Sequence, residues 1–335
     1  MGAGYVAPNP MVGALLVYNN RIIGEGYHAH YGKAHAEVNC INNVSVVDVD
    51  LICKSTLYVS LEPCAHFGKT PPCVDLILKN NIPHVVIGCS DSFEKVNGTG
   101  IQKLIAGGVK VETKVLEHEC IDLNKRFFTF HNFKRPYIIL KWAQSNDGFI
   151  DGEKDFPVKI TNEYTNKLSH KWRAEEAAIL VGTNTAIKDN PTLTARNWRG
   201  KNPVRIIIDI ALKINTANNV YNNEVPTIII NRKKMEQVGN TFFYKLDEKE
   251  NVLEGLLKCL FKNSIISCII EGGTKTLQSF VNAGLWDEAR VITNTSLNIE
   301  MGIEAPLLSN AYFSYSLEIF SDRINFFTKQ NNELL

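Results

Sequence analysis

The sequence predicts an α/β protein of two domains. Its 335 residues exceed the size at which a single hydrophobic core usually divides, about 250–300 residues. Short β-branched runs alternate with helical patterns along most of the chain, which is typical of layered α/β folds. A stretch of aromatic and cationic residues at 124–136 interrupts this alternation. We therefore place one domain at residues 1–135 and a second at 136–335.

In the first domain, a predicted hairpin comes before a series of alternating strands and helices. Two apolar runs on either side of a polar turn at 18–21 predict this hairpin, with strands at 12–17 and 22–26. Later apolar runs predict strands at 56–61, 84–89 and 109–115. Helices are expected after His35, after Cys73 and around 100–106. We interpret 124–136 as a linker, the alternative being a last helix of the first domain.

The second domain contains six compact apolar runs with helical patterns between several of them. Their β-branched character suits strands buried on both faces. These runs lie at 137–140, 178–181, 204–208, 227–230, 265–270 and 289–292.

Composition favours an intracellular enzyme. Lys and Arg number 36 against 35 Asp and Glu, so the chain has no net charge bias toward nucleic acid or a membrane surface. Apolar stretches end well short of a membrane span. Eight irregularly spaced cysteines do not form a disulfide framework. We expect a cytoplasmic protein that acts on a small molecule and binds neither nucleic acid nor membrane.

Three residues have the character of zinc ligands. His35, Cys64 and Cys73 offer one imidazole and two thiolates, and a site with three protein ligands leaves the fourth tetrahedral position for water. Glu37 follows His35 too closely to be assumed a ligand and is predicted to transfer protons in catalysis. Taken singly, each motif is weak, because a His-x-Glu triplet is common and intracellular cysteines are often buried as small apolar groups.

A pair of glycines marks a second candidate site. The segment 269–277 passes from an apolar strand through Gly272 and Gly273 into a helix. Glycines permit close approach of a ligand, and the free amides of a helix start can bind phosphate. Without further evidence, a tight turn is the more common explanation of this pattern.

The motifs together resemble those of the bifunctional deaminase/reductase family of riboflavin biosynthesis. The resemblance covers nearly the whole chain. Cytidine and tRNA adenosine deaminases usually close their site with Pro-Cys-x-x-Cys, whereas here eight residues separate the two cysteines. The matching segments are 8–13, 24–28, 35–37, 61–73, 146–148, 172–173, 181–185, 189–196 and 271–273.

For the first domain, the resemblance implies a cytidine-deaminase-like three-layer α/β/α fold. The expected reaction is zinc-dependent hydrolytic deamination of 2,5-diamino-6-(5-phosphoribosylamino)pyrimidin-4(3H)-one. In this reaction His35, Cys64 and Cys73 hold Zn²⁺ and Glu37 is catalytic. The substrate contacts implied are Asn9, His28, His66, Lys69 and Thr70.

For the second domain, the resemblance implies a dihydrofolate-reductase-like α/β fold. Its expected reaction is the NADPH-dependent reduction of the ribosyl group to ribityl, which gives 5-amino-6-(5-phosphoribitylamino)uracil. The substrate contacts implied are Arg173, Leu193, Arg196 and Glu271. The cofactor contacts implied are Gln144, Lys159, Thr185, Asp189, Gly273, Thr274, Lys275, Thr276, Leu277, Gln278 and Ser279.

Two features depart from the family pattern. Family members usually carry a helix ahead of the Pro-Asn-Pro block, and the chain given has only seven residues there, so we expect either exposed apolar sheet surface or another covering element. Lys159 occupies roughly the position of a family tryptophan near the cofactor, so the ammonium is expected to meet an NADPH phosphate instead of stacking.

Two other classes of protein compete with the bifunctional enzyme. A zinc-dependent nucleic-acid base deaminase with an appended domain would need a basic, aromatic surface. A non-catalytic protein with structural zinc would normally supply four protein ligands. The family resemblance also implies a homo-oligomer, a dimer or tetramer joined through the reductase domains.

Overall fold

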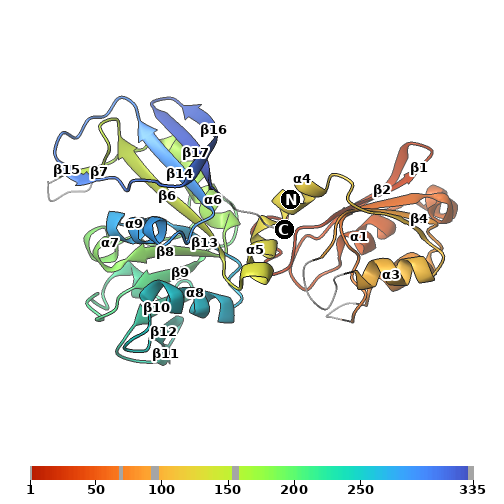
Figure 1. Cartoon of the computed structure of the whole chain (residues 1–335), viewed down its shortest axis with the longest axis horizontal. Coiled ribbons are helices and arrows are strands. Elements are labelled where there is room, and N and C mark those ends of the chain that lie inside the picture. Colours follow the sequence, from red (N-terminus) through yellow and green to blue (C-terminus); the bar gives the residue numbers. More distant parts are fainter. Residues whose placement is uncertain (1, 68–70, 92–97, 153–157, 331–335) are drawn as a thin grey trace. The chain divides into compact units, whose positions relative to one another are not determined.

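The chain folds into two compact units, and the division between them along the chain falls between Phe133 and Lys134 (Figure 1). The computed structural model describes residues 2–67, 71–91, 98–152 and 158–330. Each unit is an α/β structure, as predicted. Among the described residues, no helix combines the length and apolar character needed to span a bilayer.

The first unit is built on a five-stranded sheet with the order β2-β1-β3-β4-β5. The β1–β2 hairpin and the β1–β3 pair are antiparallel, whereas β3, β4 and β5 run parallel. Its strands are β1 (Gly13–Tyr18), β2 (Arg21–Tyr27), β3 (Thr56–Leu61), β4 (His84–Cys89) and β5 (Lys110–Glu112). Its helices are α1 (Ala36–Asn42), the 3₁₀ helix η1 (Val46–Lys54), α2 (Cys73–Lys79), α3 (Thr99–Ala106), α4 (Glu117–Leu123) and α5 (Lys125–Phe133).

Helices cover both faces of this sheet, as the three-layer prediction requires. Cys40 of α1, Ile77 of α2 and Leu104 of α3 pack with alternate strand residues in one apolar core. On the opposite face, α4 approaches β4 so closely that a Cβ on Gly88 would lie 2.3 Å from the sulfur of Cys120. A groove of about 590 Å³, lined in part by the exposed Leu15, Tyr27 and Tyr58, also lies in this unit.

Two expectations for the first unit were wrong. Segment 124–136 is largely the helix α5, which buries Phe127 and Phe128 against β-strand ends, so the alternative to the linker was correct. Aromatic residues grouped on one helical face, together with the preceding α4, produced the irregular pattern. The last strand is also shorter than 109–115, because the residues after Glu112 turn toward α4.

The second unit contains a ten-stranded sheet with the order β11-β12-β10-β9-β8-β13-β6-β14-β17-β16. Its parallel centre runs from β12 to β14, and β11, β17 and β16 are antiparallel additions. The strands are β6 (Tyr137–Ser145), β8 (Ala178–Gly182), β9 (Val204–Ile208), β10 (Thr227–Asn231), β11 (Glu236–Val238), β12 (Thr241–Lys245), β13 (Ser267–Ile270), β14 (Glu288–Asn294), β16 (Ala311–Ile319) and β17 (Asp322–Lys329).

The helices of the second unit lie on both faces of its sheet. Leu260 of α8 and Phe280 of α9 belong to one core, whereas Trp172 of α6 and Ala186 of α7 belong to the other. All six predicted strands are present and lie in the buried part of the sheet. The remaining elements are β7 (Phe149–Gly152), which pairs with β15 (Gly302–Glu304), and the helices α6 (Glu163–Glu175), α7 (Thr183–Lys188), η2 (Asn219–Tyr221), α8 (Val252–Lys262) and α9 (Thr274–Asn282).

Close packing of α1 on β2 requires a glycine. A Cβ on Gly26 would lie 2.3 Å from the backbone nitrogen of Cys40 and 2.5 Å from the carbonyl oxygen of Ala36, both in α1. Any larger residue would push α1 away from the sheet. The position of this helix, and of the residues at its start, therefore depends on Gly26.

We expect Gly26→Ala to destabilise the first unit by about 1–3 kcal/mol, because overpacking displaces α1. Gly13→Ala in β1 is the matched control, since a Cβ at Gly13 meets nothing within 4 Å. Thermal unfolding followed by far-UV circular dichroism measures the effect. Trp142, Trp172, Trp198 and Trp286 all lie in the second unit, so their fluorescence should report unchanged unfolding there. Equal stabilities of the two variants would contradict the packing argument.

Candidate metal centre and cleft

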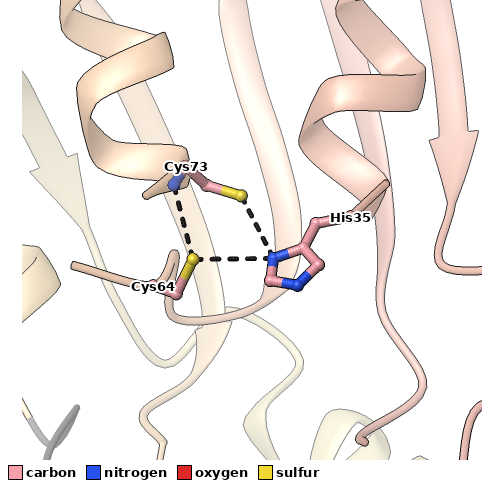
Figure 2. Close-up of side chains that lie close together, drawn as sticks. All are labelled: His35, Cys64 and Cys73. Carbon is pink, nitrogen blue, oxygen red and sulfur yellow. Dashed lines mark hydrogen bonds between the residues drawn. The ribbon is translucent and has the colours of Figure 1, made fainter. Parts of the chain in front are cut away.

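Three side chains from separate segments converge in the first unit. His35 directly precedes α1, Cys64 follows β3 in a loop, and Cys73 is the first residue of α2 (Figure 2). The Nδ1 atom of His35 lies 3.5 Å from the Cys64 sulfur and 3.4 Å from the Cys73 sulfur. All three donor atoms lie within 4.8 Å of one another.

This triangle has the dimensions of a zinc site. Tetrahedral zinc with Zn–S of about 2.3 Å and Zn–N of about 2.0 Å places nitrogen and sulfur donors about 3.5 Å apart. In the part of the chain that the structure describes, no fourth His, Cys, Asp or Glu joins this group. The donor set therefore fits a zinc ion with three protein ligands, which is the arrangement of catalytic sites rather than structural ones.

The surroundings of Cys64 favour its thiolate form. The Cys73 side chain, and then the His35 ring, stabilise the anion and lower the pKa of Cys64 to about 4. The backbone N–H of Cys73 also donates to the Cys64 sulfur at 3.3 Å. A thiolate is the form in which cysteine binds a metal.

Glu37 lies in α1 and is 3% exposed. Burial raises the pKa of its carboxyl group, and the Cys73 thiol is among the groups that interact with it. A carboxyl group in these surroundings is suited to accepting and returning a proton at near-neutral pH. It stands beside the donor triangle without belonging to it.

Two of the predicted substrate contacts lie next to this triangle. The buried His28 ring meets the His35 ring edge-on, with centroids 5.3 Å apart. Its Nδ1 lies 3.0 Å from the Ala34 carbonyl oxygen, and its Nε2 lies 3.2 Å from the Asn9 amide nitrogen. With Nδ1–H donating to the carbonyl, Nε2 accepts from Asn9, so His28 orients the Asn9 amide.

The other three predicted contacts are less defined. His66 lies on an exposed part of the loop after Cys64. Lys69 and Thr70 lie outside the described residues.

A cleft of about 990 Å³ opens in the second unit. It lies where β8 and β13 end and where α7 and α9 begin, and the carboxyl ends of parallel strands commonly carry ligand sites. Eight of the eleven predicted cofactor contacts line it: Lys159, Thr185, Asp189, Gly273, Thr274, Lys275, Thr276 and Leu277.

The side chains of the remaining three predicted cofactor contacts form hydrogen bonds with other residues of the protein. Gln144 accepts a hydrogen bond from the Trp142 indole at 2.7 Å. Gln278 bonds to Asn282 and Leu307, and the Ser279 hydroxyl donates to the Thr276 carbonyl. None of the three is among the residues that line the cleft.

A buried ion cluster lies beside the cleft, and two of its members, Lys141 and Glu271, line it. Arg173 of α6 donates two hydrogen bonds to the Glu271 carboxylate, at 2.9 and 2.7 Å. The Lys141 ammonium lies 3.8 Å from the same carboxylate. Burial alone would raise the pKa of Glu271, but Arg173 and Lys141 lower it to about 2. Glu271 is therefore a carboxylate across the physiological range.

Sequence reasoning missed Lys141. Burial lowers the pKa of this lysine, which lies in β6 and lines the cleft beside Glu271. The sequence could have indicated Lys141, because it is the one charged residue in the otherwise apolar run 137–143. A lysine is seldom placed in a buried strand without a function or a partner.

The loop after α7 connects the other predicted substrate contacts to this cluster. The Thr194 carbonyl accepts from both Arg173 and His170, at 3.3 and 2.9 Å. Leu193 is buried with a φ of 52°, and the exposed Arg196 donates to the Thr192 hydroxyl. Arg173, Leu193 and Arg196 are not among the residues that line the cleft, whereas Glu271 is.

Two family models match the chain, one in each unit. One family model, the cytidine and deoxycytidylate deaminase zinc-binding region, matches residues 2–89, and another, the RibD C-terminal domain, matches residues 136–297. The fold and the sites thus define a zinc-dependent deaminase joined to a reductase.

The relatives identify the family. The riboflavin biosynthesis protein RibD of Aquifex aeolicus is 41% identical over 289 residues, covering 85% of this chain and 80% of the relative. RibD of Bacillus amyloliquefaciens is 39% identical, covering 86% and 79%. A solved deaminase/reductase from Thermotoga maritima superposes with a TM-score of 0.89 at 32% identity, covering 98% of this chain and 94% of that one.

The chain belongs to the RibD family of bifunctional deaminase/reductases of riboflavin biosynthesis. It is an enzyme that acts on a small molecule, with zinc in the deaminase unit and NADPH in the reductase unit. The predicted family, fold class, function and cofactors are confirmed.

His170 should make the reductase unit sensitive to acid. Burial, followed by the charges of Arg173 and Arg196, lowers its pKa to about 4 from the usual 6.5. The folded state therefore binds fewer protons than the unfolded state between these values, so the stabilisation present above pH 6.5 is lost as the pH falls toward 4. Urea unfolding followed by tryptophan fluorescence should show roughly 1–3 kcal/mol less stability at pH 4.5 than at pH 7 from this group. A His170→Gln variant with the same pH dependence as the parent would contradict this assignment.

Proposed function

We propose that residues 1–135 deaminate 2,5-diamino-6-(5-phosphoribosylamino)pyrimidin-4(3H)-one and that residues 136–335 then reduce the ribosyl group of the product. The final product is 5-amino-6-(5-phosphoribitylamino)uracil. The observation that carries the proposal is the donor triangle of His35, Cys64 and Cys73 with the buried Glu37 beside it.

In the deaminase unit, His35, Cys64 and Cys73 would hold the zinc ion. When bound, zinc is a Lewis acid that makes water nucleophilic at neutral pH. Glu37 takes a proton from the attacking water and returns it to the departing ammonia, a role that its raised pKa and burial support. The amide of Asn9, oriented by His28, binds the polar edge of the pyrimidine. The resemblance assigns further substrate or phosphate contacts to His66, Lys69 and Thr70.

In the reductase unit, NADPH supplies the hydride and the protein positions the reactants. The first turn of α9 presents backbone amides to the cleft, which suits a cofactor phosphate, and Lys159 and Lys275 add positive charge at its lining. Glu271 and Lys141 offer a hydrogen-bond acceptor and a donor to the sugar or the pyrimidine. Arg173 keeps Glu271 ionised and in place. Leu193 and Arg196 provide further contacts to the substrate.

The eight free cysteines support a cytoplasmic location, where thiols stay reduced. We also propose a homo-oligomer, a dimer or tetramer, joined through the reductase units. The edge strand β16 supports it, because Tyr312, Phe313, Tyr315 and Leu317 are all more than two-fifths exposed. A long apolar edge strand is a ready surface for pairing with another chain.

Replacement of Glu37 tests the deaminase mechanism. We expect Glu37→Gln to lower ammonia release by about 10²–10⁴-fold, because proton transfer is lost. NADPH oxidation with pre-deaminated substrate should remain within twofold of the parent. Glu112→Gln, which changes an exposed carboxylate on β5, is the matched control and should retain both activities. Deamination that survives in Glu37→Gln would exclude the proposed role.

The edge strand provides the test of assembly. Phe313→Glu combined with Leu317→Glu should shift the sedimentation coefficient of the protein to that of a smaller species, since each places a charge in the proposed contact. Val238→Glu, on the opposite edge strand β11, is the control and should sediment like the parent. A parent protein that is monomeric at all concentrations would refute the oligomer.

A further inference from the structure

Unlike the other two metal donors, Cys64 does not lie at the start of a helix. His35 is the residue at which α1 starts, and Cys73 is the first residue of α2, so helices position both. Cys64 lies in the loop that follows β3, in which Pro63 cannot donate a backbone hydrogen bond. Contacts to other segments must therefore decide where its sulfur lies.

Glu62 binds the start of α3 through its side chain. One carboxylate oxygen accepts from the backbone nitrogens of Gly100 and Ile101, at 2.9 and 3.3 Å. The other accepts from Gly98 and Asp91, at 3.0 and 3.3 Å. Gly98 is the N-cap residue of α3 and has no side chain, so Glu62 acts as the cap from a distant segment. Glu62 is only 4% exposed.

Two further residues of α3 contact the same loop. A Cβ on Gly100 would lie 2.2 Å from the Pro63 carbonyl oxygen, so the helix can approach the loop only with glycine at this position. One turn later, the Lys103 ammonium donates to the Ala65 carbonyl oxygen at 2.8 Å. Residues 62 and 65, on either side of Cys64, are thus hydrogen-bonded to α3, and residue 63 packs closely against it.

The first turn of α2 approaches Cys64 from its own direction. The backbone nitrogen of Cys73 donates to the Cys64 sulfur, and that of Val74 donates to the Cys64 carbonyl oxygen at 3.2 Å. The loop is therefore held by contacts with the N-terminal parts of two helices, α2 and α3. The start of α2 contacts Cys64 itself, and the start of α3 contacts its neighbours.

We propose that Glu62, Gly100 and Lys103 are positioning residues that hold Cys64 in the geometry required for zinc. They are not among the proposed zinc ligands or substrate contacts, and they act through the backbone of residues 62–65. Partners of metal ligands commonly change metal affinity by about 10–100-fold when they are mutated. This inference rests on the proposed zinc ligands.

The first test is Glu62→Gln, which keeps the shape of the side chain but turns one acceptor into a donor that faces backbone donors. We expect zinc affinity to fall by about 10–100-fold in competition with a chromophoric chelator, and zinc release to be faster. In the cobalt-substituted protein, the thiolate charge-transfer and ligand-field bands should shift, because the geometry at Cys64 changes. Glu112→Gln is the matched control, and NADPH oxidation on pre-deaminated substrate should match the parent in both variants.

A milder pair of variants covers the case in which Glu62→Gln fails to fold. Lys103→Met removes one hydrogen bond at the partly buried end of the lysine and leaves the helix cap intact, so we expect a several-fold loss of zinc affinity. Lys103→Arg keeps a donor and should restore most of it. Parent-like zinc affinity and parent-like cobalt spectra in Lys103→Met and in any folded Glu62→Gln would overturn the proposal.

The ligand assignment can fail separately from the positioning role. A parent protein without one zinc per chain, or a Cys64→Ser variant that binds zinc as tightly as the parent, would refute the proposed ligands and the inference with them. Tight zinc binding in the parent that is lost in Cys64→Ser, together with unchanged binding in the Glu62 and Lys103 variants, would refute the positioning role alone.

Discussion

The deaminase site depends on the close packing of two helices, α1 and α2, on one face of the five-stranded sheet. His35, Cys64 and Cys73 are brought together because α1 and α2 pack on the same face of that sheet. The packing of α1 relies on Gly26, where a side chain would collide with the helix backbone. Small residues at such contacts leave room for the polar groups that carry the chemistry.

Both units place charged groups where strands end and helices begin, but they stabilise these groups differently. In the deaminase unit, burial raises the pKa of Glu37 and so favours a carboxyl group that exchanges protons. In the reductase unit, Arg173 and Lys141 keep Glu271 ionised in spite of its burial. One carboxyl group is suited to proton transfer and the other to holding a fixed charge.

Much of the fold follows from local patterns. The buried parallel strands of the reductase unit are short apolar runs, and their β-branched composition and length identify them without tertiary information. Helix α5 was less certain, because Phe127, Phe128 and Phe130 suit either a helix face or an irregular contact, and only packing distinguishes the two. Strand β16 has no pattern of buried residues by which it could be predicted, since it is exposed along most of its length, whereas β17 alternates buried and more exposed residues.

The sequence by itself determined the chemistry of the protein. A histidine and two cysteines at their particular spacing predict the zinc donors, and a nearby glutamate predicts the proton-transfer group. The motifs together predict the family, because residue type and order are properties of the chain alone. The tertiary structure decided how these groups are held. Lys141 and Glu271 lie near each other at two neighbouring parallel strands, β6 and β13. His28 orients Asn9, and Glu62 caps a helix that starts 37 residues later. Such contacts join residues distant in sequence, so only the packed fold brings them within hydrogen-bonding or Coulombic range.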